Sequence, residues 1–191
     1  IQVNNNNHKS FYIKGNQKYT PTTYSVEGDF SQAAFWLAAG VLSGSVVCEG
    51  LSLDSLQGDK DILRIIRDMG GKLKLEDNQV IASRSSLKGI DIDASQIPDL
   101  VPVITVMAAL SEGKTVIKNA GRLRIKESDR LKAITVELNK IGGKITELDD
   151  GLIIEGVENF TGGTVESWND HRIAMALAIA ATRCQHPLVI N

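Results

Sequence analysis

The sequence has few of the residues that hold small secreted domains or metal sites together. Its 191 residues include two cysteines, Cys48 and Cys184, which lie far apart and without metal-ligand spacing. This usage predicts two buried, reduced thiols in a cytoplasmic protein. A basic surplus is also missing, because 21 lysines and arginines face 23 acidic residues, a net charge of −2. This balance argues against a nucleic-acid partner, which usually requires a basic surface.

Long apolar runs are missing as well. No stretch approaches the ~20 apolar residues that a membrane-spanning helix needs, so we expect no membrane partner. The amide-rich start lacks the apolar region of a signal peptide. The chain begins at Ile1 and stops at Asn191 directly after a strand-like segment, and we expect both ends to lie inside a longer protein. With 42% hydrophobic residues, the chain can still bury a real core.

What the sequence does contain is an internal repeat. Three apolar helical segments begin near aspartates, Asp29, Asp99 and Asp170, which are 70 and 71 residues apart. Two further helical segments end at Gly70-Gly71 and Gly142-Gly143, 72 residues apart, where glycine suits a left-handed C-terminal cap. Self-similarity at a fixed period predicts supersecondary units that share one core.

Hydrophobic periodicity and turn residues place the elements of an α/β fold. We expect helices at residues 30–42, 59–69, 100–110, 129–141 and 173–181, and strands at 46–49, 72–76, 79–83, 90–93, 115–118, 144–148, 152–155 and 188–190, with a turn at 77–78. Residues 1–25 predict a hairpin around Gly15-Asn16, and the polar run 4–7 predicts an exposed turn.

The two kinds of helix predict how the layers are arranged. The segments 30–42 and 100–110 are apolar on almost every face, which is typical of helices buried on all sides. The segments 59–69 and 129–141 are amphipathic. We therefore expect helices inside and sheets outside. Equivalent units also bring their helix N-termini to one end, where converging dipoles attract an anionic ligand.

The charged stretch 121–131 carries the strongest chemical signal. It contains Arg122, Arg124, Lys126, Glu127, Asp129 and Arg130 immediately before or at the start of the amphipathic helix. Ser128 or Asp129 can cap this helix, and its N-terminal N–H groups favour an anion. Taken alone, the stretch also fits a solvated loop in which Lys126 and Arg130 pair with acidic neighbours at the surface, worth ~0–1 kcal/mol.

Four segments resemble one enzyme family. Residues 122–131 read Arg-Leu-Arg-Ile-Lys-Glu-Ser-Asp-Arg-Leu and closely resemble a signature of the 3-phosphoshikimate 1-carboxyvinyltransferase (EPSP synthase) family, and residues 26–31, 96–102 and 169–176 agree with it in order and approximate spacing. The resemblance covers nearly the whole chain. It implies the enolpyruvyl transferase fold, in which each of two lobes contains three βαβαββ units with apolar helices inside and mixed sheets outside, an inside-out α/β barrel.

The resemblance also implies how the chain is divided. Residues 1–25 would end the N-terminal lobe, and residues 26–191 would form most of the C-terminal lobe. The units of this lobe would be about 26–89, 90–157 and 158–191, with the third truncated. The missing N-terminal lobe would be the partner of this chain, in an enzyme that we expect to be a monomer.

In this family the enolpyruvyl group of phosphoenolpyruvate moves to the 5-hydroxyl of shikimate 3-phosphate, in aromatic amino-acid biosynthesis. The resemblance implies that Glu127 donates and retrieves the proton at C3 of phosphoenolpyruvate, and that Asp99 contacts the shikimate hydroxyls and accepts the proton of the attacking one. Lys126 would contact shikimate 3-phosphate and the reacting oxygens. Arg130 and Arg172 would hold the phosphoenolpyruvate carboxylate, which matches the arginine fork. The family needs no metal or organic cofactor.

Other charged residues are secondary candidates. Arg122 stands where some family members have an asparagine ligand, and Arg124 would neutralise local carboxylates. His171 would be a hydrogen-bonded orienting residue rather than a proton shuttle, and Asp170 would lie beside it. Asp29 is expected to be a plain helix cap, and an alternative for Arg172 is a pair with Asp170.

Two other functions stay open. One is the sister enzyme that transfers the enolpyruvyl group to UDP-N-acetylglucosamine, although the run 122–130 argues against it. The other is a non-catalytic repeat domain that binds anions. Because most family ligands of the shikimate phosphate would lie outside this chain, we expect the isolated chain to be inactive.

Overall fold

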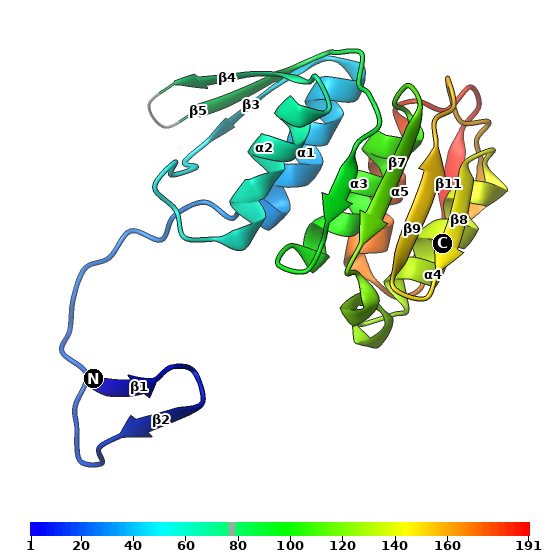
Figure 1. The fold of residues 1–191 in the computed structure, drawn as a ribbon. Helices are drawn as coiled ribbons and strands as arrows, with labels where there is room; N and C mark the ends of the chain where they lie inside the picture. The colour runs from blue at the N-terminus through cyan, green and yellow to red at the C-terminus, as the bar shows by residue number, and fades with distance from the viewer. Residues whose placement is uncertain (77–78) are drawn as a thin grey trace.

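The computed structural model describes residues 1–76 and 79–191 (Figure 1). Its second unit contains, in order, β6 (Asp91–Asp93), the 3₁₀ turn η2 (Pro98–Leu100), α3 (Val101–Ala109), β7 (Lys114–Lys118), the 3₁₀ turn η3 (Gly121–Ile125), α4 (Arg130–Lys140), β8 (Lys144–Leu148) and β9 (Gly151–Glu155). The strand order in its sheet is β6-β7-β9-β8, with β6 and β7 parallel and the other pairs antiparallel. The unit therefore has the βαβαββ order that the resemblance implied.

The other units repeat parts of this pattern. The first contains α1 (Phe30–Ser43), β3 (Ser45–Glu49), the 3₁₀ turn η1 (Gly58–Asp61), α2 (Ile62–Asp68), β4 (Lys72–Glu76) and β5 (Gln79–Ser83). Its sheet order, β3-β5-β4, matches β7-β9-β8. The third contains β10 (Gly163–Val165), α5 (His171–Ala181) and β11 (Leu188–Ile190), and its parallel pair β10-β11 matches β6-β7.

The core forms where the three apolar helices meet. Helices α1, α3 and α5 pack against one another, β3 and β5 cover α1, and β7 and β9 cover α3 (Figure 1). All residues of α3 are buried, because this helix lies between the other two and its own sheet. The predicted arrangement of helices inside and sheets outside is confirmed.

The expectation that α1 is buried on all sides is wrong. The side chain of Trp36, in the middle of α1, is 63% exposed. In the second unit, α4 packs against α5 of the unit that follows. The third unit has no such second helix within the described residues, so the equivalent flank of α1 is not covered.

The helix boundaries show how local chemistry shifts an element. Gly70 and Gly142 have φ of 85° and 94°, so the predicted left-handed caps are confirmed. The predicted helices 59–69 and 100–110 begin instead as the 3₁₀ turns η1 and η2. Helix α5 starts at His171, two residues before the predicted start, because the side chain of Asp170 caps it.

The N-terminal hairpin differs most from its prediction. Strands β1 (Val3–Asn6) and β2 (Ser10–Ile13) pair antiparallel, and the turn lies at residues 7–9, not at Gly15-Asn16. Its first two residues, Asn7 and His8, have positive φ, which suits a tight hairpin and which asparagine adopts readily. The predicted exposed turn at 4–7 is therefore mostly strand. The predicted turn at 77–78 lies outside the described residues, and the short, glycine-containing strand β10 was not predicted.

The hairpin lies apart from the rest of the chain (Figure 1). The apolar side chains of Phe11, Tyr12 and Ile13 are all exposed, so the described chain leaves this segment without a core. Of the helices that the structure describes, none is long and apolar enough to span a membrane.

Candidate active site

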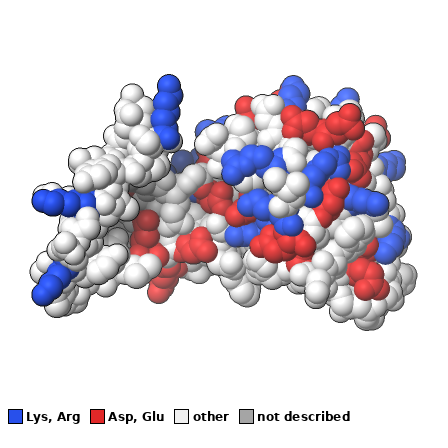
Figure 2. All heavy atoms as spheres, turned by 90° about the horizontal axis from the view of Figure 1, so that it is seen from below, with Lys and Arg blue, Asp and Glu red and all other residues white. Residues whose placement is uncertain are grey.

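Three helix starts converge at one end of the repeat units. Turn η2 carries Asp99 into α3, Arg130 is the first residue of α4, and Asp170 precedes α5. The N-terminal ends of α1, α3 and α5 point to the lower side of Figure 1, and Figure 2 shows basic and acidic side chains interleaved on that side. Helix N-termini carry unpaired N–H groups and partial positive charge, so this end favours anions.

Arg130 is the centre of this cluster, and its side chain is only 1% exposed. Its Nε and Nη2 donate to the two oxygens of Asp170 at 2.8 and 3.2 Å. Its Nη1 donates to Asp99 at 2.9 Å, and Nη2 also donates to Glu127 at 2.6 Å. A buried guanidinium bonded to three carboxylates is not a surface ion pair, so that alternative is wrong for Arg130.

Asp170 joins α4 to the start of α5. Its carboxylate accepts the backbone N–H of Arg172 at 2.9 Å and the hydroxyl of Ser128 at 3.0 Å, besides Arg130. Burial by itself would raise the pKa of Asp170, but these donors together hold the pKa below its usual range. An ionised, buried carboxylate therefore fixes Arg130 relative to α5.

Three cations of the cluster, Lys126, Arg130 and Arg172, contact Asp99. Lys126 Nζ lies 3.2 Å from its Oδ1, and Arg172 Nη2 lies 3.5 Å from its Oδ2. Burial would raise the pKa of Asp99, but Arg172, Lys126 and Arg130 outweigh it and lower the pKa. Asp99 makes no side-chain cap to α3, and Arg172 meets Asp170 only through its backbone N–H. Asp99 is therefore not a helix cap, and the alternative pair of Arg172 with Asp170 is wrong for their side chains.

Glu127 and Lys126 lie on the outer side of the cluster. They connect η3 to α4, and the side chain of Glu127 is 52% exposed. Of the three carboxylates on Arg130, this is the most exposed. A ligand can therefore displace Glu127 from Arg130 without opening the core.

The secondary candidates have different surroundings. Arg124 donates to Asp129 and Glu147 at 2.9 and 2.8 Å, so it does neutralise local carboxylates and ties the loop to β8. Arg122 is exposed and has no ion pair with a described residue. The His171 ring lies 4.0 Å from Asp170, beyond hydrogen-bond distance, so its orienting role stays a prediction. Asp29 accepts the N–H of Ser31 at 2.8 Å, which confirms its cap.

Sequence reasoning missed Asp59. This residue lies in η1 and accepts a hydrogen bond from the hydroxyl of Ser31 in the first turn of α1. Burial raises the pKa of Asp59, and the negative charge of Asp99 adds to the increase, while Ser31 and Arg172 oppose it. Asp59 is therefore within electrostatic range of the cluster. The repeat was the available signal, because Asp59 precedes Asp129 by 70 residues.

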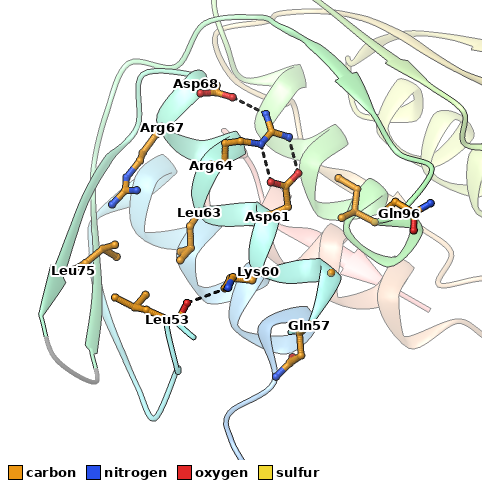
Figure 3. Close-up of a pocket in the computed structure, with 12 residues that line it drawn as sticks. Leu53, Gln57, Lys60, Asp61, Leu63, Arg64, Arg67, Asp68, Leu75 and Gln96 are labelled. Atoms are coloured by element: carbon orange, nitrogen blue, oxygen red, sulfur yellow. Dashed lines mark hydrogen bonds and ion pairs between the residues drawn. The ribbon is translucent and has the colours of Figure 1, made fainter. Parts of the chain in front are cut away.

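A hollow of about 580 Å³ lies along α2 and is lined by none of the predicted site residues (Figure 3). Arg64 within it donates to Asp61 at 2.6 and 2.7 Å and to Asp68 at 2.8 Å. Lys60 donates to the backbone oxygen of Leu53 at 3.0 Å. Because Arg64 and Lys60 already have partners close by in the sequence, we place the candidate site at the helix starts instead.

The lowered carboxyl pKa values predict that the fold is sensitive to acid. The pKa values of Asp99, Asp170 and Glu137 are lower in the folded chain than the ordinary 3.8, 3.8 and 4.5. Their stabilisation is thus present above these ordinary values and is lost as the pH falls below about 4.5. We expect urea unfolding to show a smaller free energy of unfolding at pH 3 than at pH 7.

Two variants test whether the cluster causes this loss of stability in acid. Asp170→Asn is expected to reduce stability more at pH 7 than at pH 3, because the carboxylate contributes only when it is ionised. The exposed Asp54→Asn serves as the control. An equal loss for Asp170→Asn at both pH values would contradict the prediction.

Comparison with known proteins identifies the family. The family model for EPSP synthase (3-phosphoshikimate 1-carboxyvinyltransferase) matches residues 1–191. The 3-phosphoshikimate 1-carboxyvinyltransferases of Clostridium acetobutylicum and Clostridium novyi are 60% and 54% identical over 191 residues, which is 100% of the chain and 44% of each relative. A solved EPSP synthase from Acinetobacter baumannii matches with a TM-score of 0.86 and 31% identity over 100% of the chain and 47% of its own. The chain spans less than half of these relatives, and because the family model matches its whole length, it belongs to the EPSP synthase family.

Proposed function

We propose that the chain supplies one lobe of an enzyme that transfers the enolpyruvyl group of phosphoenolpyruvate to the 5-hydroxyl of shikimate 3-phosphate. One observation carries the proposal: Asp99, Lys126, Glu127, Arg130 and Arg172 meet at the helix starts. The reaction needs cations for anionic substrates, a base at a hydroxyl and an acid at a carbon. This set of residues offers each of these groups.

Arg130 and Arg172 are proposed to hold the carboxylate of phosphoenolpyruvate. Arg172 makes only long contacts with Asp99, of 3.4 and 3.5 Å, so its N–H groups can turn to a better acceptor. Arg130 donates four hydrogen bonds to its three carboxylate partners, and Glu127 is the most exposed of these partners. We infer that the ligand carboxylate replaces Glu127 as the acceptor of Arg130 Nη2. Glu127 is thereby released to act as an acid and base.

Once released, Glu127 is proposed to take up a proton from solvent and to donate it to C3 of phosphoenolpyruvate. The substrate hydroxyl then adds to C2 while its proton passes towards Asp99, and Lys126 stabilises the oxygens that gain charge. Loss of phosphate from the tetrahedral intermediate and return of the C3 proton to Glu127 give the enol ether product. Asp99 suits its role because three cations keep it ionised before the reaction.

The remaining expectations concern what lies around this lobe. We propose that residues 1–25 belong to the N-terminal lobe and that units of about 26–89, 90–157 and 158–191 form most of the C-terminal lobe. The exposed apolar hairpin supports this division, because it has no core of its own here. Since one chain would supply both lobes, we propose a monomer. Cys48 and Cys184 are half-buried, so the predicted full burial is wrong, but both are free, in agreement with a reducing cytoplasm.

The isolated chain is expected to release no phosphate from phosphoenolpyruvate, because it holds only part of the proposed site. The matched experiment is a chimera in which residues 1–191 replace the aligned 44% of the Clostridium acetobutylicum relative. We expect the chimera to release phosphate only when shikimate 3-phosphate is present. Turnover by the isolated chain would contradict the division of the site.

The same assay separates the alternatives. Turnover with UDP-N-acetylglucosamine instead of shikimate 3-phosphate would favour the sister enzyme. A folded chimera, as judged by its melting temperature, that turns over neither substrate would favour a non-catalytic domain. Either result would overturn the proposed function.

A further inference from the structure

Helix α4 carries a second buried charge, Glu137, which the proposed reaction does not use. Its side chain is 1% exposed. One carboxylate oxygen accepts the indole N–H of Trp168 at 2.7 Å, and the other accepts the backbone N–H of Glu166 at 3.0 Å. Lys140 Nζ lies 2.8 and 3.0 Å from the two oxygens. Glu137 therefore binds both its own helix and the loop 166–170.

This loop has an unusual backbone where Glu137 holds it. Trp168 and Asn169 both have φ of 56°, in the left-handed region that a bulky side chain rarely adopts. Two such residues in succession need outside support to persist. Glu137 supplies this support, because its carboxylate accepts hydrogen bonds from the indole of Trp168 and from the backbone N–H of Glu166.

The residue that follows the left-handed pair is Asp170, the partner of Arg130 and the cap of α5. Arg130 and Glu137 are seven residues apart on α4, about two turns, so they lie on the same face of the helix. Helix α4 thus binds the loop 166–170 at two points. Arg130 donates to Asp170, and Glu137 accepts from Glu166 and Trp168. A shift of the loop at Glu137 would move Asp170, and with it the guanidinium of Arg130 and the start of α5.

The junction of the first and second units shows that packing alone does not require a carboxylate at this position. Ile65 occupies the equivalent place on α2, 72 residues before Glu137, and Ile97 precedes Trp168 by 71 residues. Both isoleucines are buried, and Ile97 is followed by Pro98, which has no left-handed conformation. At this junction Ile97 has φ of −132°, whereas the equivalent residue beside Glu137, Trp168, is left-handed.

We propose that Glu137 is a positioning residue, which fixes the loop 166–170 and thereby sets how Arg130 and Arg172 present their N–H groups to the carboxylate of phosphoenolpyruvate. This inference rests on the proposed function, which assigns that carboxylate to the two arginines. Glu137 itself touches no reacting atom.

The test uses Glu137→Gln in the chimera, with Glu166→Gln as the control. Glutamine keeps the size of the side chain but sets an amide N–H against one of the two loop donors. We expect the KM for phosphoenolpyruvate to rise about 10–100-fold, because small displacements of substrate-holding groups have effects of this size. The KM for shikimate 3-phosphate should stay unchanged, whereas a loss of folded protein would lower kcat and leave both KM values unchanged. Glu166→Gln, in the same loop but with an exposed side chain, should change neither.

Two readouts do not depend on turnover. With Trp36→Phe in place, Trp168 is the only tryptophan, and Glu137→Gln should shift its fluorescence emission to longer wavelength. The same variant of the 191-residue chain should move the NMR resonance of the Arg130 Nε–H group, which donates to Asp170. Trp168→Phe, which removes only the indole donor and leaves an aromatic ring, should move the Arg130 resonance in the same way.

The outcomes separate this inference from the proposed function. An inactive wild-type chimera would overturn the proposed function. The NMR resonance of Arg130 would then be the only test of whether Glu137 positions that residue. An unchanged Arg130 resonance in Glu137→Gln would overturn that role. An active chimera in which Glu137→Gln leaves the KM for phosphoenolpyruvate unchanged, or raises both KM values equally, would overturn it as well.

Discussion

Replacement of Arg130 by methionine is expected to lower the free energy of unfolding of the chain by about 3–5 kcal/mol at pH 7, because removal of one partner leaves buried charges uncompensated. Methionine has a similar length and can fill the space of the arginine stem. It cannot donate to Asp170, which is buried, or to Asp99. The loss can be measured from urea unfolding followed by circular dichroism.

Arg64→Met is the matched control for this variant. Arg64 also pairs with carboxylates, those of Asp61 and Asp68, but its side chain is 58% exposed. We expect a change within about 1 kcal/mol, as for exposed ion pairs. The difference between the two variants should shrink at pH 3, because without Arg130 the carboxyls of Asp170 and Asp99 lose a group that lowers their pKa and take up protons more readily. A loss below 1 kcal/mol for Arg130→Met at pH 7 would mean that the cluster does not stabilise the fold.

The sequence was informative where local chemistry decides the structure. Gly70 and Gly142 ended their helices as predicted, since few other residues adopt a left-handed cap. The repeat also predicted that Asp29, Asp99 and Asp170 would lie at equivalent helix starts, because equivalent units place equivalent ends together. Arg130, at the start of α4, carries the opposite charge, and only the fold brings it within bonding distance of Asp99 and Asp170.

Tertiary contacts decided what the sequence did not predict. Nothing in the sequence around Glu137 distinguishes it from the polar face of an amphipathic helix, and only the fold places Trp168 beside it. Asp59 and Ser31, 28 residues apart, meet for the same reason. The exposure of Trp36 depends on what packs against α1, and no local pattern contains that information.

Glu127→Gln in the chimera is expected to lower kcat by about 10²–10⁴-fold, the usual contribution of a general acid or base. The glutamine oxygen can still accept from Arg130, and the exposed side chain adds little to stability, so the melting temperature should stay close to that of the parent. Glu155→Gln, an exposed carboxylate on β9, is the control and should keep full activity. Phosphate release with saturating substrates measures the effect.

A second measurement separates proton transfer from binding. If Glu127 donates and retrieves the proton at C3, the chimera in heavy water should place solvent deuterium at C3 of phosphoenolpyruvate and of the product. Glu127→Gln cannot carry that proton, so the exchange should be lost together with kcat. Loss of kcat with exchange retained would assign the C3 proton to another group. If Glu127→Gln raised the KM for phosphoenolpyruvate at unchanged kcat, Glu127 would not transfer the proton. Its role would then be limited to the contact with Arg130 that a carboxylate ligand displaces.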